Sequence, residues 1–457
     1  MHPNLATTKA RRTGSTIPRR SARLVWVAVV AVLAACGGGG DGSAPGATSC
    51  DLDTQKSWLR DYMLDAYYWA GVAPNPAPAG YASVEAYLDA LRFTGDATVP
   101  SDRWSYIQDS VSYNQFFGEG STLGYGLQVN GRELALPLRA RYIEPGSAAD
   151  TAGVVRGDII VSVNGRSAAD LIAANDFALL SPAKAGDAIT VVLDTAAGTK
   201  TVTLTAAVYA LVPVSARQII TLANGRKAGY LFLKDFITQA EGPLSAAMAY
   251  FRDAGATELI LDLRYNGGGR VSTSAVLASL IAGSARNGSV FATLNFNAGH
   301  TGSNNSYTLN AAAASPFTRA VVLTGSRTCS ASELVVNGLK PYMQVVTVGA
   351  ASCGKPFGFV PVQSCGNTYS AVNFESFNGA GQGRYYNGIA ATCPVAEDFT
   401  RPLGDPTETL TAAAVTYLGS GTCPPAAVAG QARPAAVTAR QRAFVAEPGD
   451  RQGMWAR

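Results

Sequence analysis

The 457-residue chain contains only two histidines, His2 and His300. Histidine is the commonest group to take the proton from a serine nucleophile. His2 lies in a segment that we expect to be removed, and His300 lies in a polar, glycine-containing run typical of a loop. If the chain is a serine hydrolase, a lysine is therefore the expected base, with His300 as the alternative. No cluster of residues has the spacing of metal ligands, so we expect no metal and no other cofactor.

The chain also lacks an N-terminal apolar run long enough to span a bilayer comfortably. Residues 24–35 are apolar and follow five arginines, which predicts a signal peptide over residues 1–35. The run ends in Leu-Ala-Ala-Cys36, which resembles a bacterial lipobox and implies lipidation of Cys36; the alternative is an ordinary secretory signal. Residues 36–50 are glycine-rich and predict a flexible tether. We expect a lipid-anchored protein on the periplasmic side of a bacterial cell envelope, at the outer membrane.

Without residues 1–35, the chain has no excess of positive charge. Residues 1–35 hold six Lys and Arg and no acid, which leaves 30 basic and 32 acidic residues and a net charge of −2. We therefore expect no nucleic-acid partner. Residues 424–457 are rich in Pro, Ala and Arg, which predicts a disordered tail.

Six cysteines remain besides Cys36, and an even number in an exported chain suggests disulfides. Six cysteines allow 15 connectivities, and some could be free buried thiols. The pairing that we expect is Cys329–Cys353, Cys365–Cys393 and Cys50–Cys423. The first pair would clamp the segments that carry Ser330 and Lys355.

Sequence patterns divide the remainder into three regions. Residues 51–115 contain apolar residues at helical spacing and predict a small helical region. Residues 120–208 contain strand signals: Ile159, Val161 and Val163 alternate as in a half-buried strand. Residues 213–423 alternate buried strands with helices, which indicates crossover units. The expected fold class is a multidomain one, part α/β and part α+β.

The middle region, residues 120–208, resembles a PDZ domain along most of its length. The resemblance rests on Gly124-Tyr125-Gly126-Leu127, on the Pro145-Gly146 turn, and on Arg156-Gly157-Asp158 before the strand and the Asn-Gly turn. It implies that residues 124–127 bind the terminal carboxylate of a peptide through backbone N–H groups, and that the peptide adds as a strand. The alternative is a PDZ-like scaffold that binds no peptide.

Three motifs of the third region carry chemistry. They are Asp262-Leu-Arg-Tyr-Asn-Gly-Gly-Gly269, Ser330-Ala-Ser-Glu333 and Gly354-Lys355. With the PDZ-like region before them, they resemble the C-terminal processing peptidases, also called tail-specific proteases, over most of residues 52–420. The resemblance implies a ClpP/crotonase-like α/β protease domain with Ser330 as nucleophile and Lys355 as general base.

Physical chemistry is consistent with these roles. A turn before a helix projects the serine and leaves N–H groups at the helix start unpaired, so Ala331 N–H can stabilise an oxyanion together with Gly268 or Gly267. Lys355 must be neutral to accept a proton, and lowering its pKa to about 7–8 costs roughly 4 kcal/mol, which burial can supply. The alternatives are that Ser330 only caps a helix, or that Ser332 is the nucleophile.

The sequence departs from the family at one position. Many members carry a glutamine four residues after the lysine, where this chain has Phe359. Gln363 is a possible third catalytic residue, Asn373 is another, and a dyad alone is the alternative. Ser181 and Lys184 fit the Ser-x-x-Lys pattern of penicillin-recognising enzymes, but the companion motifs are absent.

The sequence as a whole predicts a serine endopeptidase of the cell envelope. The PDZ-like region would capture accessible C-terminal tails of proteins or peptides, and Ser330 would cleave a nearby bond through an acyl-enzyme. The alternatives are a non-catalytic lipoprotein that binds peptide tails and a lipoprotein that binds carbohydrate or cell wall.

Overall fold

The structure is a computed structural model, and it describes residues 46–131, 136–425 and 453–455, all within one compact unit. The expected signal peptide, Cys36 and residues 37–45 of the expected tether lie outside the described residues. No helix among the residues that the structure describes has the length and apolar character needed to cross a bilayer.

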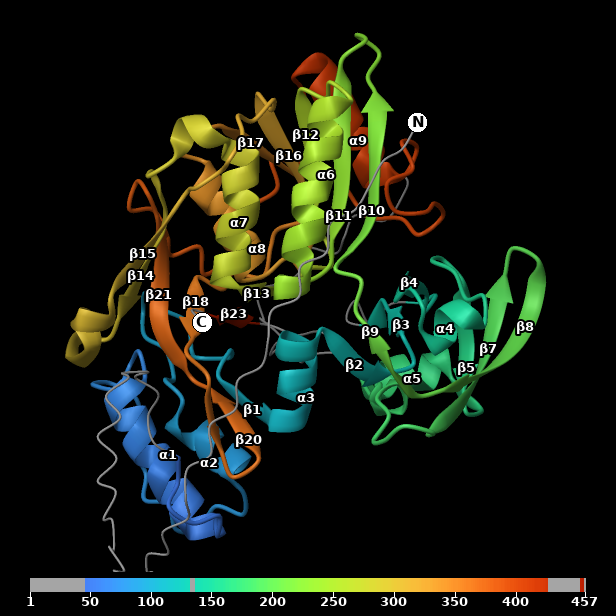
Figure 1. Ribbon diagram of the computed structural model, residues 1–457. Coiled ribbons are helices and arrows are strands. Elements are labelled where there is room, and N and C mark those ends of the chain that lie inside the picture. Colours follow the sequence, from blue (N-terminus) through green and yellow to red (C-terminus); the bar gives the residue numbers. More distant parts are fainter. Residues whose placement is uncertain (1–45, 132–135, 426–452, 456–457) are drawn as a thin grey trace, which may run out of the picture. The chain divides into compact units, whose positions relative to one another are not determined.

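The N-terminal region consists of helices that pack around aromatic side chains. Its elements are α1 (Leu52–Ala66), α2 (Val84–Leu91), β1 (Tyr106–Asp109), α3 (Ser110–Asn114) and the π-helix η1 (Gln115–Glu119). Asp51 and Ser83 begin α1 and α2 by accepting backbone N–H groups. β1 pairs with β20 (Asn367–Ser370), so this region shares a sheet with the third region of the chain (Figure 1).

The PDZ-like region has a core of its own. Its strands form the sheets β6-β5-β7-β8, β3-β4 and β2-β9. Its elements are β2 (Ser121–Gly124), β3 (Leu127–Val129), β4 (Ala140–Ile143), α4 (Ala148–Thr151), β5 (Ile159–Val163), β6 (Arg166–Ser167), α5 (Ala168–Ala174), η3 (Ala178–Leu180), β7 (Ala188–Thr195), β8 (Gly198–Thr205) and β9 (Ala207–Ala210).

One expectation for this region was wrong in detail. The simple alternation in β5 fails, because Ile160 and Val163 are buried whereas Val161 is 45% exposed. The cause is an irregularity in the pairing of β5 with β7 between Ile160 and Ser162, which shifts the inward face by one residue.

The third region is built on a six-stranded sheet with the order β10-β11-β12-β16-β17-β22. The strands β11, β12, β16 and β17 are parallel, and β10 is an antiparallel edge strand. The strands are β10 (Val214–Thr221), β11 (Lys227–Leu233), β12 (Glu258–Asp262), β16 (Arg319–Thr324), β17 (Gln344–Gly349) and β22 (Cys393–Pro394).

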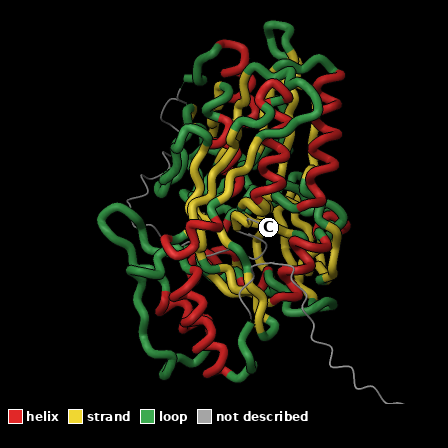
Figure 2. The backbone as a smooth tube through the Cα atoms, turned by 60° about the vertical axis from the view of Figure 1, so that its left-hand side comes forward, coloured by secondary structure: helices red, strands yellow, loops and turns green. Residues whose placement is uncertain are grey.

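Helices cover both faces of this sheet. One face packs against α6 (Glu241–Asp253), α7 (Val271–Ala282) and α8 (Ala331–Leu339), and the other against α9 (Thr409–Ser420) (Figures 1 and 2). Because the strands are parallel, the segments that follow β12, β16 and β17 meet at one edge. Those segments carry the three motifs. Short 3-10 helices connect the elements: η4 (Thr238–Ala240), η5 (Ser284–Arg286) and η6 (Ala298–Ser303).

A second six-stranded sheet has the order β13-β23-β18-β21-β14-β15. Its strands are β13 (Gly268–Arg270), β14 (Val290–Phe296), β15 (Asn305–Thr308), β18 (Phe357–Phe359), β21 (Val372–Asn378) and β23 (Gly453–Trp455), and the short β19 (Val362–Ser364) pairs with β20. The expected disorder of residues 424–457 was wrong for β23, because two strands of the sheet pair with its backbone. Residues 426–452 and 456–457 lie outside the described residues.

The disulfides confirm one expected pair and correct two. Cys329 and Cys353 are bonded as expected, but the other bonds are Cys50–Cys365 and Cys393–Cys423. The reason is packing between distant segments. Helix α1 lies against β20 through Trp58 and Tyr369, which brings Cys50 to the turn that holds Cys365. Cys423 follows α9, which packs on the sheet that contains Cys393.

Candidate active site

Ser330 occupies a strained turn between β16 and α8. Its backbone angles are φ 62° and ψ −114°, which a residue with a side chain rarely adopts. A sharp strand-to-helix turn of this kind exposes the hydroxyl of a nucleophilic serine in other hydrolases. The side chain is fully buried, and among the described residues its Oγ makes no hydrogen bond. Ser330 thus occupies the N-cap position of α8, where Glu333 accepts its backbone N–H, while its Oγ makes no hydrogen bond to the described residues.

The neighbouring hydroxyl of Ser332 is engaged. Ser332 Oγ donates to the carbonyl oxygen of Asn266 at 3.0 Å. Cys329 N–H donates to the same carbonyl at 3.1 Å. These bonds attach the start of α8 to the glycine-rich turn after β12, and they favour Ser330 over Ser332 as the free hydroxyl.

Lys355 is a buried lysine without a hydrogen-bonded partner on Nζ among the residues that the structure describes. Burial lowers its pKa to about 7, although attraction to Asp102 and Glu333 acts in the opposite direction. Nζ lies 3.9 Å from the centre of the Phe359 ring. A substantial fraction of the amine is therefore neutral near pH 7, as a general base requires. Nζ and Ser330 Oγ do not hydrogen bond to each other, and such bonds are often long before substrate binds.

Glu333 binds the turns that carry Ser330 and Lys355. Its Oε2 accepts the backbone N–H of Ser330 at 2.9 Å and that of Lys355 at 2.8 Å, and its Oε1 accepts the N–H of Gly354 at 2.8 Å. Burial raises the pKa of Glu333, and the hydrogen bonds from Ser352 and these backbone groups oppose that shift. The sequence identified Glu333 only as the last residue of the Ser330-Ala-Ser-Glu333 motif. The structure adds that one carboxylate binds the main chains of both Ser330 and Lys355.

The candidate oxyanion donors differ in availability. Ala331 is the first residue of α8, so its N–H has no intrahelical acceptor. The N–H of Gly268 donates to Asn266 Oδ1 at 2.8 Å, which makes Gly267 the more available donor of the two expected from this turn.

The disulfide between Cys329 and Cys353 joins the residue before Ser330 to the turn that leads to Lys355. These two sulfurs lie near the Glu333 carboxylate, but a disulfide offers no thiolate to a metal.

The sequence did not point to Asp102 and Arg103 of the N-terminal region. Asp102 is buried, accepts a hydrogen bond from Tyr67 at 2.6 Å, and interacts with Lys355 through its charge. Arg103 donates to the carbonyl oxygen of Cys353 at 3.2 Å. The two lie about 250 residues before Lys355, and no local pattern indicates that they reach it.

Three other candidates lie elsewhere. Gln363 is exposed and donates to Asn114 at 2.8 Å, so the structure does not bring it to Lys355. Asn373 binds the carbonyl oxygen of Ala66 and the N–H of Val360. His300 Nε2 lies 3.0 Å from Asp65 at the end of α1. Among the residues described, none of these side chains contacts the Lys355 amine.

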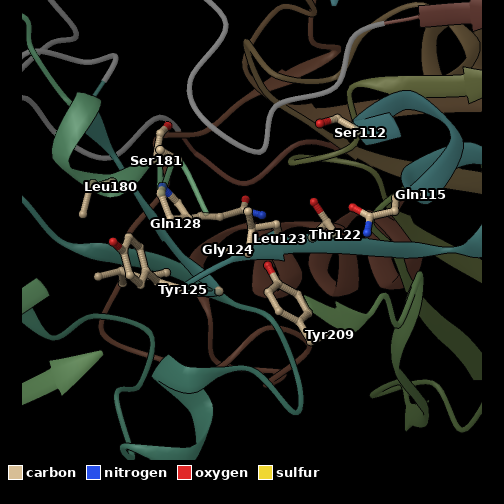
Figure 3. A pocket seen from close by; sticks show the side chains of 14 residues that line it. Ser112, Gln115, Thr122, Leu123, Gly124, Tyr125, Gln128, Leu180, Ser181 and Tyr209 are labelled. Carbon is tan, nitrogen blue, oxygen red and sulfur yellow. The ribbon is translucent and has the colours of Figure 1, made fainter. Parts of the chain in front are cut away.

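The expected peptide-binding residues line a groove of the PDZ-like region. Gly124 ends β2, Leu127 begins β3, and Gly126 has φ 75°, which favours glycine. Residues 122–128 and 180–183 line this groove together with Ser112 and Gln115 of the N-terminal region, and Tyr209 lies beside Gly124 (Figure 3). Ser181 of the Ser-x-x-Lys pattern is thus part of this groove.

Three family models match the chain in the order of its regions. The model of the peptidase S41 N-terminal domain matches residues 54–106, that of the PDZ domain residues 139–194, and that of peptidase family S41 residues 227–376. Residues 54–106 and 227–376 therefore belong to peptidase family S41. This confirms the resemblance to C-terminal processing peptidases and the expected fold class.

Relatives of the S41 family agree. Carboxyl-terminal-processing peptidase 1, chloroplastic, of Arabidopsis thaliana is 30% identical over 240 residues, covering 50% of this chain and 47% of its own. The carboxyl-terminal-processing protease of Picosynechococcus is 29% identical over 249 residues, covering 52% and 55%. The chain thus spans about half the length of these curated relatives. A solved S41 protease structure from Bacteroides fragilis matches 80% of this chain and 97% of its own, at 26% identity and a TM-score of 0.63.

Proposed function

We propose that this S41-family chain is a serine endopeptidase that binds C-terminal tails of proteins and cleaves a nearby peptide bond with Ser330 and Lys355. The observation that carries the proposal is that Glu333 binds the backbone of both Ser330 and Lys355. One of its oxygens binds the main chains of both residues, while Ser330 Oγ and Lys355 Nζ are buried and have no hydrogen-bond partner among the described residues. Burying a hydroxyl and an amine without hydrogen-bond partners lowers the stability of the fold, and such groups are typical of functional sites.

The proposed reaction begins with neutral Lys355. Its Nζ takes the proton of Ser330 Oγ as the oxygen attacks the substrate carbonyl carbon. The carbonyl oxygen becomes negative and accepts hydrogen bonds from Ala331 N–H and the turn at Gly267, a type of contact worth about 10²–10³ in rate per donor. The lysine then gives its proton to the leaving amine, and an acyl-enzyme on Ser330 remains. Water, activated by the same amine, hydrolyses this ester.

Capture of the substrate is proposed for the groove at residues 124–127. Backbone N–H groups of such a loop bind a terminal carboxylate, and the adjacent strand edge pairs with the peptide. The proposed location is the bacterial cell envelope, with a lipid on Cys36 as the anchor. Three disulfides in the described residues support an oxidising compartment.

The test uses an unstructured peptide with a free C-terminus. We expect Ser330→Ala to abolish cleavage, whereas Ser332→Ala, which loses one hydrogen bond to a backbone carbonyl, reduces it far less. Amidation of the peptide's C-terminus should raise KM, because the groove then loses its anion. Cleavage that persists in Ser330→Ala would exclude Ser330 as nucleophile. Tail binding without any cleavage by the unmodified chain would favour the non-catalytic alternative.

A further inference from the structure

A three-residue strand from the C-terminal part of the chain completes the sheet beside the candidate active site. This strand, β23 (Gly453–Trp455), lies between β13 and β18 and runs parallel to both (Figure 1). β13 and β18 are not neighbours in that sheet. The backbone of β23 therefore fills a slot between them that is one strand wide.

The two walls of the slot are the strands that flank the candidate dyad. β13 begins at Gly268, within the turn that is bonded to the start of α8 through Asn266. β18 begins two residues after Lys355, and its Phe359 ring covers the Lys355 amine. Trp455 pairs with Arg270 on one side and with Phe359 on the other. A strand in the slot thus runs between the oxyanion turn and the proposed base.

The hydrogen-bonding groups of β13 fit a strand in this position. Phe236 occupies the opposite edge, where its N–H donates to Gly268 and its carbonyl accepts from Arg270. Because successive residues of a strand bond to opposite sides, the N–H and C=O of Gly269 face β23. A Cβ on Gly269 would lie 2.2 Å from the Phe236 carbonyl oxygen, so only glycine allows this close pairing.

We propose that an extended substrate binds as a strand in the slot between β13 and β18, and that residues 453–455 occupy this slot as an internal competitor. The proposal rests on the proposed function and adds a regulation to it. Strand edges bind peptides through the main chain with little regard to sequence, so the chain's own segment and a substrate present the same groups. Both Ser330 and Lys355 are 0% exposed with β23 in place. A substrate therefore needs part of the structure to move before it reaches Ser330, and the proposal assigns this movement to β23.

The test compares two substitutions of Trp455 in the full chain. Trp455→Pro removes an N–H and disfavours a paired strand, whereas Trp455→Ala removes the side chain and keeps the N–H. We expect kcat/KM for an unstructured peptide to rise about tenfold in Trp455→Pro, the gain expected when a few ladder hydrogen bonds no longer compete with substrate. Trp455→Ala should remain much closer to the unmodified protein. A peptide Gly-Met-Trp-Ala-Arg, added in excess to Trp455→Pro, should restore the lower rate.

Hydrogen exchange separates failure of this inference from failure of the proposed function. The amide of Gly269, which faces β23, and those of residues 357–359 should exchange faster in Trp455→Pro than in Trp455→Ala. If Ser330→Ala abolishes cleavage but Trp455→Pro changes neither rate nor exchange, the internal competitor is excluded and the peptidase stands. If no variant cleaves, the peptidase proposal fails. In that case hydrogen exchange alone tests whether residues 453–455 occupy the slot. Unchanged protection in Trp455→Pro excludes this occupation, and faster exchange supports it.

Discussion

Two buried basic residues of the S41 region, Lys355 and Arg264, follow strands of the same sheet, but their pKa values are shifted in opposite directions. Lys355 is fully buried, and burial lowers its pKa to about 7. Arg264 is 2% exposed, and burial alone would lower its pKa too, but attraction to Asp262 and Glu408 raises it well above its usual value. Arg264 binds Asp262 at 2.9 Å and Glu408 at 2.6 Å.

The difference lies in where nearby carboxylates direct their oxygens. Those around Arg264 contact the guanidinium itself. Glu333 is close enough to act on Lys355, yet its oxygens accept backbone N–H groups, and Asp102 accepts from Tyr67 and Ser105. Carboxylates on the head group of a buried cation keep it charged, whereas a buried amine without them is driven towards its neutral form, which can accept a proton. Substitutions of the two residues should therefore differ in whether they lower activity or stability.

The largest effect is expected from Lys355→Arg. Arginine cannot lose its proton in a protein, so the position would keep a cation but lose the base. We expect kcat/KM to fall by a factor on the order of 10⁴ or more, as for removal of a catalytic base in other serine hydrolases. Lys355→Met should lose as much activity without burying a charge. Steady-state cleavage of an unstructured peptide measures both. Appreciable activity in Lys355→Arg would contradict the role of base.

Arg264→Met should act on stability instead. It leaves the buried carboxylates of Asp262 and Glu408 without their cation, and breaking a buried pair in this way costs about 3–5 kcal/mol. We expect the free energy of unfolding, measured by denaturant titration, to fall by that amount. Arg252→Met is the matched control, because the Arg252 side chain is 45% exposed and pairs only with exposed Asp253. Equal effects of the two substitutions would remove the contrast drawn above.

The disulfide at the site should matter more for activity than the one remote from it. Cys329 and Cys353 lie beside Ser330 and Lys355, whereas Cys50 and Cys365 join the N-terminal helix to a surface turn. Replacing the first pair by alanine should lower kcat by about 10², the cost of a misplacement near 1 Å. Replacing the second pair should lower stability but leave kcat of the folded protein nearly unchanged. Equal losses of kcat would show that the first disulfide has no positioning role.

The pH dependence of cleavage should follow the Lys355 amine. Below a pH of about 7 the amine is increasingly protonated, so kcat/KM should fall about tenfold per pH unit towards acid and level off above pH 7. The sign is that of a base with a lowered pKa, whose active form is the deprotonated one. A profile of kcat/KM between pH 5 and 9 measures it. A plateau that begins only near pH 10 would mean that Lys355 is not desolvated in solution.

Local pattern was enough to predict the turn that carries Ser330 and a helix after it, because both depend on neighbours in sequence. Long-range contacts account for what was missed. The hydrogen bond between Glu333 and the Lys355 backbone and the pairing of Cys50 with Cys365 join residues 22 and 315 positions apart, and Asp102 acts on Lys355 from the N-terminal region. A composition rich in Pro, Ala and Arg predicted disorder for the tail, and it could not reveal that a vacant strand position binds residues 453–455.

The smallest effects are expected at Gln363 and at Phe359, the position where many family members carry a glutamine. Gln363→Ala should change kcat/KM by no more than about twofold, since its amide binds exposed Asn114 rather than Lys355. Phe359→Leu should act differently. The ring face stabilises the ammonium form by about 0.5–2 kcal/mol, so its loss should move the pH profile of kcat/KM towards acid by a fraction of a pH unit or more. A shift in Gln363→Ala and none in Phe359→Leu would mean that an amide, and not an aromatic ring, adjusts the base.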